Sequence, residues 1–278
     1  MSTELGIVVR RLSSPSEFQE AEDVQAAVWG VTDSREIVPK HIMIAMHDSG
    51  GLALGAFDRR KMVGFAIMMA GYLHGTPYLY SHMTGVVSQY QSKGVGYLLK
   101  RKQRDFAMER GFKLIAWTFD PIIAKNAYFN LGKLGAISRN FHANYYGEMR
   151  DSINYGWPTD RILAEWHLDP AVKAKIDSSK KGGGGYSPIR TKGAEPSLEC
   201  VDWKVDLKAP YVRLRIPGDI VGLKEKNPSQ ALRWREATRE VFTSYFGAGF
   251  AAVAVSREVG ATSYVLTKAE LPRNIFAG

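Results

Sequence analysis

The stretch Gln91-Ser92-Lys93-Gly94-Val95-Gly96, of the form Q-x-x-G-x-G, decides the fold of this chain. An apolar run over 78–87 precedes it and an amphipathic run over 95–110 follows, which predicts a strand, a glycine-rich turn and a helix. A turn of this kind presents backbone N–H groups at the positive end of a helix, where phosphate groups bind. The stretch therefore predicts an anion site within a strand–turn–helix unit.

Two common phosphate-binding motifs do not fit this turn. A dinucleotide fingerprint requires a third glycine, and Leu99 occupies that position. A Walker loop requires Gly-Lys followed by Ser or Thr, which the stretch lacks. The remaining alternatives are a phosphate ligand of another kind and a tight turn that binds nothing.

Hydrophobic periodicity on both sides of the turn predicts an α/β fold with a mixed sheet. The predicted order is β-α-α-β-β-β-α-β-α-β-β, and a crossover around the turn predicts one parallel strand pair. A hairpin over 51–72 predicts antiparallel neighbours, with helices on both faces of the sheet. The predicted elements are 7–12, a helix from 15, a helix from 39, 51–57, 62–72, 78–87, 95–110, 114–119, 126–134, 135–141 and 161–168.

The helix over 95–110 has an apolar side and a charged side. We expect Val95, Leu99 and Phe106 to be buried, and Lys100 and Arg104 to be exposed. Farther along the chain, Arg233, Arg235 and Arg239 recur on one stripe of a second helix, over 230–246, which we interpret as a solvated face, with docking against the first domain as the alternative.

Composition changes after residue 168. Residues 169–198 contain Lys180-Lys181 and a glycine run over 182–185, which predicts a flexible linker. Residues 199–278 contain further strands and the helix over 230–246, which predicts a smaller α+β subdomain. We therefore divide the chain into a domain over 1–168, a linker over 169–198 and a subdomain over 199–278.

The 278 residues are 45% hydrophobic and 23% charged, as in an ordinary soluble protein. The single cysteine, Cys200, excludes an intrachain disulfide and favours the cytoplasm. The longest apolar run is too short for a bilayer, and we see no signal-peptide pattern, so no membrane role is expected. The net charge is +9, and residues 169–278 hold 18 Lys and Arg against 12 Asp and Glu. We expect a solvated basic surface, with an RNA- or tRNA-linked role as an alternative.

Together, the turn, the element order over 5–168 and the later segment Asn126-Ala127-Tyr128-Phe129-Asn130 resemble the GNAT acyltransferases. Lys133-Leu134-Gly135, which follows, resembles the end of the family's Asn-containing helix. The resemblance covers about sixty percent of the chain, and residues 199–278 lie outside the minimal GNAT fold. It implies a GNAT-type N-acyltransferase with an acyl-CoA co-substrate and no metal.

The resemblance also implies which residues contact the acyl-CoA. The backbone of the turn would hold the pyrophosphate, while Lys93 adds a positive charge where the family often has arginine. The strand end before the turn would lie against the thioester, and Asn126 would face the pantetheine arm. The implied contact residues are Val86, Val87, Gln91, Lys93, Gly94, Val95, Gly96 and Asn126.

The catalytic groups are less closely specified. His82 lies on the strand that enters the turn and titrates near neutrality, so we assign it as the candidate base, with a structural histidine as the alternative. The family commonly places a tyrosine that acts as the general acid on the Asn-containing helix, but Leu131 occupies that position here. Tyr128, two residues after Asn126, and Tyr146 are the candidate acids, and their alternative role is packing.

Arg161, at the start of the last strand of the first domain, could bind a substrate carboxylate. Its alternative is a surface ion pair. The expected reaction is transfer of an acyl group, acetyl by default or succinyl, to the amine of a small metabolite such as an amino acid. A non-catalytic CoA-binding or regulatory protein is the alternative. We expect a homodimer and no nucleic-acid partner.

Overall fold

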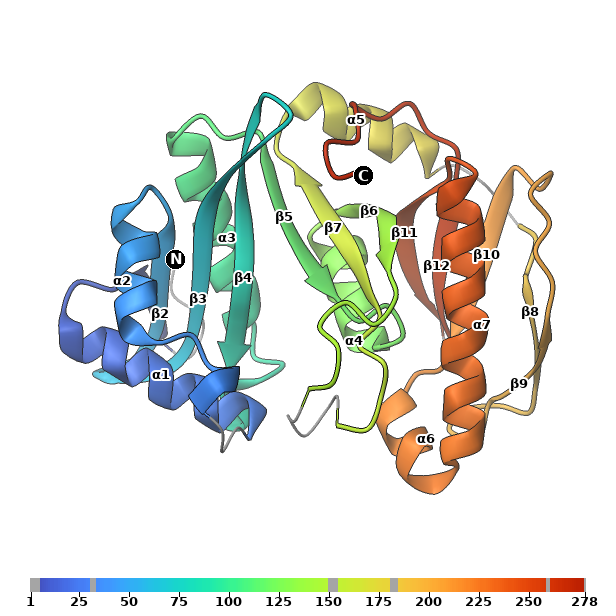
Figure 1. The fold of residues 1–278 in the computed structure, drawn as a ribbon, viewed down its shortest axis with the longest axis horizontal. Coiled ribbons are helices and arrows are strands. Elements are labelled where there is room, and N and C mark those ends of the chain that lie inside the picture. Colours follow the sequence, from blue (N-terminus) through green and yellow to red (C-terminus); the bar gives the residue numbers. More distant parts are fainter. Residues whose placement is uncertain (1–5, 31–33, 150–154, 181–184, 259–260, 278) are drawn as a thin grey trace. The chain divides into compact units, whose positions relative to one another are not determined.

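The computed structural model describes residues 6–30, 34–149, 155–180, 185–258 and 261–277. Its contacts divide the chain into two compact units, and most of the helices and strands are labelled in Figure 1. The first unit comprises Met1–Trp117 and Glu148–Trp157. The second unit comprises Thr118–Gly147 and Pro158–Gly278.

The first unit contains a sheet of order β1-β2-β3-β4-β5. Its strands are β1 (Val8–Arg11), β2 (Leu52–Asp58), β3 (Lys61–Leu73), β4 (Thr76–Val86) and β5 (Leu114–Phe119), the last two residues of β5 belonging to the second unit. Neighbours from β1 to β4 are antiparallel, whereas β4 and β5 are parallel. The predicted mixed sheet is therefore confirmed.

Helices cover both faces of this sheet, as expected (Figure 1). Helices α1 (Pro15–Trp29) and α2 (Lys40–Asp48) share a core with Phe65 and Ile67 of β3. Helix α3 (Val95–Glu109) covers the opposite face, where a side chain at Gly64 would contact Leu99. Short 3-10 turns, η1 (Ser34–Glu36) and η2 (Ser88–Tyr90), precede α2 and α3 respectively.

The second unit contains a sheet of order β7-β6-β11-β12-β10 and a separate β8-β9 pair. Its strands are β6 (Ile137–His142), β7 (Arg161–His167), β8 (Ile189–Lys192), β9 (Glu199–Trp203), β10 (Tyr211–Ile216), β11 (Ala251–Glu258) and β12 (Ala261–Thr267). Its helices are α4 (Ala124–Ala127), the π-helix η3 (Tyr128–Lys133), α5 (Pro170–Ser179), α6 (Ile220–Lys226) and α7 (Pro228–Gly247). Trp234, Phe242 and Tyr245 of α7 are fully buried in this unit.

This division differs from the domain boundaries predicted at residues 168 and 199. Ala252 of β11 pairs with Ser138 of β6, and the rings of Phe141 and Phe242 stack with centroids 6.2 Å apart. Residues 199–278 therefore share one sheet and one core with β6 and β7. The sequence could not indicate this, because the pairing joins segments more than a hundred residues apart.

The segment predicted as a linker also differs from the structure. Asp169 caps α5 by accepting a hydrogen bond from the Ala171 N–H, and Pro170 occupies the first turn. This Asp-Pro pair is a helix-start signal that the composition of the segment obscured. Strand β8 follows later in the same segment. Most of the glycine run, residues 182–184, lies outside the described residues.

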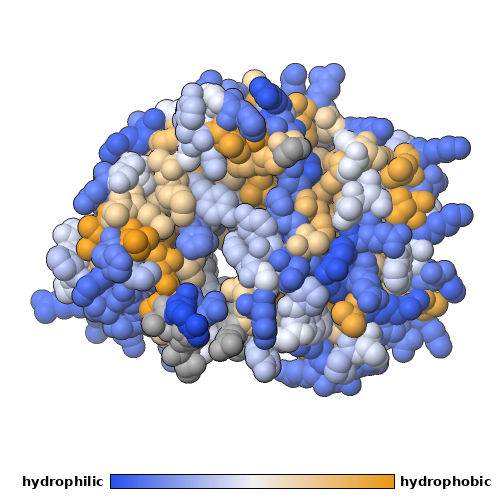
Figure 2. Space-filling view, in the orientation of Figure 1, coloured by the Kyte–Doolittle hydropathy of each residue, from blue (hydrophilic) through white to orange (hydrophobic). Residues whose placement is uncertain are grey.

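On the face drawn in Figure 2, hydrophobic areas are separated from one another by hydrophilic surface. Among the residues that the structure describes, no helix is both long enough and apolar enough to cross a membrane.

Candidate functional site

The glycine turn joins β4 to α3 through η2. Ser92 has φ 62° and Gly94 has φ 84°, so two residues of the turn adopt the left-handed conformation. Gly94 is the N-cap of α3, and no side chain caps the helix. The first backbone bond into the helix runs from the Leu98 N–H to the Gly94 carbonyl, 3.0 Å.

This geometry suits an anion. The first N–H groups of a helix have no partner within it, and left-handed residues in a turn make successive N–H groups converge. Gln91, Ser92, Lys93 and Gly94 are all exposed, so the turn is accessible to a ligand. The helix dipole adds about half a positive charge at this end. The turn can therefore hold a phosphate group without a dedicated side chain.

Contacts on both sides brace the turn. The Gln91 side-chain amide donates to the Val86 carbonyl, 3.1 Å, so this side chain ties the turn back to β4. The hydroxyl of Tyr90 donates to Asp58 at the end of β2, 2.5 Å. The ammonium of Lys93 lies 5.5 Å from the centre of the Tyr90 ring. The turn is thus fixed to two strands, and Lys93 keeps an exposed charge beside it.

Strand β4 has an open edge before the turn. It pairs with β3 as far as Val86, but its described pairs with β5 are only Leu79 with Ile115 and Tyr80 with Ala116. Both strands continue beyond these pairs. The separation of β4 from β5 leaves one edge of β4 without a strand partner on that side within the first unit.

Backbone groups on this edge point in alternating directions. Val87 uses its N–H to bond the Val63 carbonyl, 3.0 Å, and its carbonyl accepts the Tyr90 N–H, 2.9 Å. The alternation then turns the N–H groups of Thr84 and Val86 away from β3. The Val87 N–H is therefore used in pairing with β3, whereas the Val86 N–H is not, and the roles expected of both residues stay predictions.

His82 lies at an irregularity in β4. Ile67 of β3 pairs with Met83 and Met68 pairs with Ser81, so His82 is the extra residue of a β-bulge. Bulges re-aim side chains and are common beside active sites. The side chain has an exposed surface, while the surrounding protein atoms lower the pKa of the imidazole by desolvation. At neutral pH the ring is therefore mainly neutral and able to accept a proton.

Two candidate residues of the second unit lie on α4 and η3. Asn126 is exposed on α4, and Tyr128 begins the π-helical turn. A side chain added at Gly132 would meet the Tyr128 ring at 2.8 Å, and the Arg257 guanidinium lies 5.2 Å from the ring centre. Tyr128 is therefore packed within its own unit, and its predicted role as an acid stays a prediction. The predicted helix over 126–134 is mostly π-helix, a form frequent at functional sites.

The other two candidates of this unit contact each other. The hydroxyl of Tyr146 lies 2.8 Å from the Thr118 hydroxyl, and the guanidinium of Arg161 lies 5.4 Å from the Tyr146 ring centre. Arg161 is 8% exposed, donates to the Asp160 carbonyl at 2.9 Å and lies 3.8 Å from Asp120. Arg161 is therefore buried and hydrogen-bonded. The alternative to a substrate contact had been an ion pair at the surface, which this burial does not fit.

Sequence reasoning missed the ion pairs of helix α7. Arg235 donates two bonds to Asp120, 2.7 and 3.3 Å, and is 4% exposed. Arg239 donates two bonds to Asp160, 2.8 and 3.0 Å. The interpretation of this arginine stripe as a solvated face is wrong for Arg235. The buried Trp234 beside it was the available signal, since a tryptophan on a solvated face is unusual.

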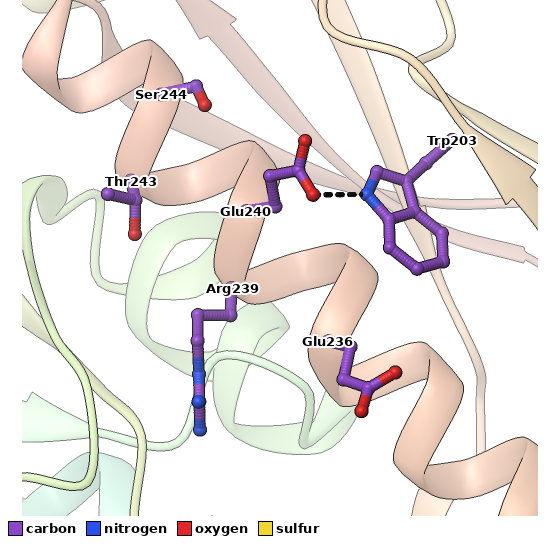
Figure 3. A pocket seen from close by; sticks show the side chains of 6 residues that line it. All are labelled: Trp203, Glu236, Arg239, Glu240, Thr243 and Ser244. Carbon is purple, nitrogen blue, oxygen red and sulfur yellow. Dashed lines mark hydrogen bonds between the residues drawn. The ribbon is translucent and has the colours of Figure 1, made fainter.

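A surface pocket of about 440 Å³ lies between β9 and α7 in the second unit (Figure 3). The indole N–H of Trp203 donates to Glu240, 2.7 Å, and Arg239 is the side chain already paired with Asp160. The pocket contains no residue of the predicted site. Its lining residues are Trp203, Glu236, Arg239, Glu240, Thr243 and Ser244.

Comparison with known proteins finds similarities in structure but none in sequence. No protein-family model and no curated protein sequence matches the chain. Among solved structures, an aminoglycoside 6'-acetyltransferase type Ii is 19% identical, covers 59% of this chain and 98% of its own, and has a TM-score of 0.47. The ribosomal-protein-S18-alanine N-acetyltransferase from Escherichia coli is 17% identical, with 59% and 94% covered and a TM-score of 0.46.

A GNAT family acetyltransferase from Elizabethkingia anophelis with acetyl-CoA bound is 15% identical, with 58% and 98% covered and a TM-score of 0.43. Each of these three likenesses covers about three fifths of this chain.

Proposed function

We propose that this chain is an acyl-CoA-dependent N-acyltransferase whose glycine turn binds the pyrophosphate of the donor. One observation carries the proposal: an uncapped helix N-terminus with two left-handed residues directly follows a strand with an open edge. A ligand with a diphosphate next to an extended, amide-containing arm matches both features. The turn takes the diphosphate, and the strand edge offers backbone groups to the arm.

In this proposal, each part of the turn has a defined role. The backbone N–H groups of Gly94, Val95 and Gly96 bind phosphate oxygens, and Lys93 adds a positive charge from the exposed side. Gln91 holds the turn against β4 through its bond to Val86. The free backbone donors of the β4 edge face the thioester carbonyl, where they stabilise the oxyanion formed on attack.

The donor supplies an acyl group as a thioester, and the acceptor is the amine of a small metabolite. His82 accepts the proton that the amine nitrogen loses as its bond to the acyl carbon forms. A phenol, Tyr128 or Tyr146, returns a proton to the thiolate released when the carbon–sulfur bond breaks. Asn126 and Arg161 are proposed contacts to the pantetheine arm and to a substrate carboxylate. Acetyl-CoA is the first donor to test, and succinyl-CoA the second.

Reversal of one charge tests donor binding. Lys93→Glu places a carboxylate beside the bound diphosphate and should weaken CoA binding about tenfold or more, or ~1.4 kcal/mol. Lys102→Glu, an exposed position on α3, is the matched control and should bind as the wild type does. Calorimetric titration with CoA and thermal stabilisation by acetyl-CoA measure this. If no CoA ester binds the wild type, the proposal is rejected.

A second variant tests the base. His82→Gln should reduce kcat roughly 10²–10⁴-fold, with CoA affinity unchanged, if the imidazole removes the proton. Wild-type activity should rise with pH as His82 loses its proton. Because desolvation lowers the pKa of His82, the midpoint of this rise should lie below the usual range for histidine. CoA release with a panel of amines is the assay. Turnover equal to wild type in His82→Gln would assign the proton transfer elsewhere, and tight CoA binding without turnover would favour the non-catalytic alternative.

A further inference from the structure

Lys100, expected to be exposed, is buried in the middle of α3. It is 4% exposed, and its Nζ lies 2.9 Å from the Ser81 hydroxyl and 3.8 Å from the centre of the Trp117 ring. Ser81 and Gln103, which complete the surroundings, are 3% and 0% exposed. A fully buried lysine is rare without a partner of opposite charge, so this position calls for an explanation.

The amine lies where β4 and β5 part. Ser81 immediately precedes the bulge residue His82, and Trp117 immediately follows Ala116, the last described β5 residue that pairs with β4. Lys100 thus contacts one residue of each strand at the end of their ladder. All of these residues belong to the first unit.

No carboxylate pairs with this amine among the described residues. The amine faces the Ser81 hydroxyl from β4 and the Trp117 indole from β5, and the Gln103 amide from α3 itself is bonded to that same hydroxyl. His82 is the adjacent titratable group along β4. Desolvation lowers the pKa of Lys100 to about 7, and no charged neighbour contributes to the shift. The amine therefore changes charge near neutral pH.

A change of charge alters the hydrogen bonds at the junction. The ammonium form only donates, so the Ser81 hydroxyl then directs its hydrogen to the Gln103 carbonyl oxygen, 3.2 Å away. The neutral amine can accept the Ser81 hydrogen, while the Gln103 amide nitrogen donates to Ser81 at 3.1 Å. The attraction between Lys100 and the Trp117 ring exists only in the charged form.

We propose that Lys100 is a positioning residue: its amine joins Ser81 of β4 to Trp117 of β5 and so fixes the open edge and the bulge that presents His82. This inference rests on the proposed function for its role in catalysis, but the positioning itself does not. Lys100 is also the sixth residue of α3, about 8 Å along the helix from its start. A bound polyanion at the turn favours the charged form and strengthens the junction.

The test compares Lys100→Met, which removes the amine, with Lys102→Met, an exposed lysine on the same helix. Hydrogen exchange is measured without ligand at the amide of Val87, which donates to the Val63 carbonyl of β3, and at that of Gly85, which the strand alternation also directs to β3. We expect exchange about tenfold faster in Lys100→Met, because local opening becomes easier, and wild-type exchange in Lys102→Met. Equal exchange in all three proteins would overturn the proposal. If Lys100→Met does not fold, Ser81→Ala decides by the same criterion.

CoA affinity as a function of pH provides the second readout. Wild-type affinity should rise as the pH falls from about 8 to 6, by at most about tenfold per pH unit, because the ligand favours the charged amine. In Lys100→Met this part of the dependence should disappear, leaving only the ionisation of CoA itself, and affinity should fall. An unchanged pH profile would overturn the role of Lys100. Absence of CoA binding to the wild type would reject the proposed function, while hydrogen exchange would still decide the positioning.

Discussion

The two units bury charge in opposite ways. In the first unit, Lys100 is buried against a hydroxyl and an indole, and desolvation lowers its pKa to about 7. In the second unit, Asp120 and Asp160 are 8% and 1% exposed, and each accepts two hydrogen bonds from one arginine. The arginines retain their charge at any pH at which the protein is folded.

Glu165 makes the contrast clearer. Burial by itself raises the pKa of this carboxyl, but the hydrogen bonds from His167 and Arg139 outweigh burial, and the pKa is lowered. Burial acts on Lys100 without such partners and shifts its pKa toward the neutral form. Hydrogen-bonding and ionic partners, rather than the depth of burial, therefore decide whether a buried group stays charged. Lys100 is therefore a buried group of the first unit whose charge responds to pH near neutrality.

The largest expected effect comes from breaking a pair in the second unit. Asp120→Ala leaves Arg235 buried without its carboxylate and removes the charge that Arg161 faces. We expect a loss of roughly 3–5 kcal/mol in the free energy of unfolding, the range for an uncompensated buried charge. Urea denaturation monitored by tryptophan fluorescence measures it.

The double variant Asp120→Leu with Arg235→Leu is the control for this loss. It removes the stranded charge together with its partner, so it should lose less stability than Asp120→Ala alone. An Asp120→Ala protein within about 1 kcal/mol of wild type would mean that these pairs do not hold the second unit together.

A smaller, pH-dependent effect is expected in the first unit. The unfolded chain keeps the Lys100 proton up to its ordinary pKa of 10.5, whereas the folded protein releases it near 7. Between these values the unfolded state binds more protons, so stability rises with pH, by about 1.4 kcal/mol per pH unit at most. Lys100→Met lacks this contribution, so its free energy of unfolding relative to wild type should be most favourable at pH 6–7 and should become steadily less favourable as the pH rises.

Denaturation of both proteins between about pH 6 and 9.5 measures the difference, since all other groups titrate alike in the two. Parallel stability curves would show that Lys100 keeps its charge in the folded protein. The two units would then differ only in the partners of their buried charges, and not in whether a buried group changes its charge near neutral pH.

Features that depend on residues close together in the sequence could be predicted, and features that depend on distant residues could not. The glycine turn, its strand and its helix are encoded within about thirty neighbouring residues, so their pattern was sufficient. Lys100 was misassigned because the helix buries a wider face than the apolar stripe suggests, and its partners Ser81 and Trp117 lie on other elements. The bulge at His82 was equally hidden, since a register shift is a property of two strands.

The same reasoning explains the second unit. Asp120 and Arg235 are 115 residues apart, and nothing local marks them as partners. The helix start at Asp169-Pro170, in contrast, is a local capping signal, within a segment whose composition is typical of a linker.

The smallest expected effect tests whether an ion pair stabilises the protein when it is exposed rather than buried. Lys173 and Asp177 on α5 form a bond of 2.6 Å, as short as any pair above, but their side chains are 63% and 44% exposed. Lys173→Ala should change the free energy of unfolding by about 0.5 kcal/mol or less, because water screens the charges and replaces the lost partner. Urea denaturation beside Asp120→Ala measures both on one scale. A loss at Lys173 as large as that at Asp120 would mean that distance between charges, and not burial, sets the energies compared here.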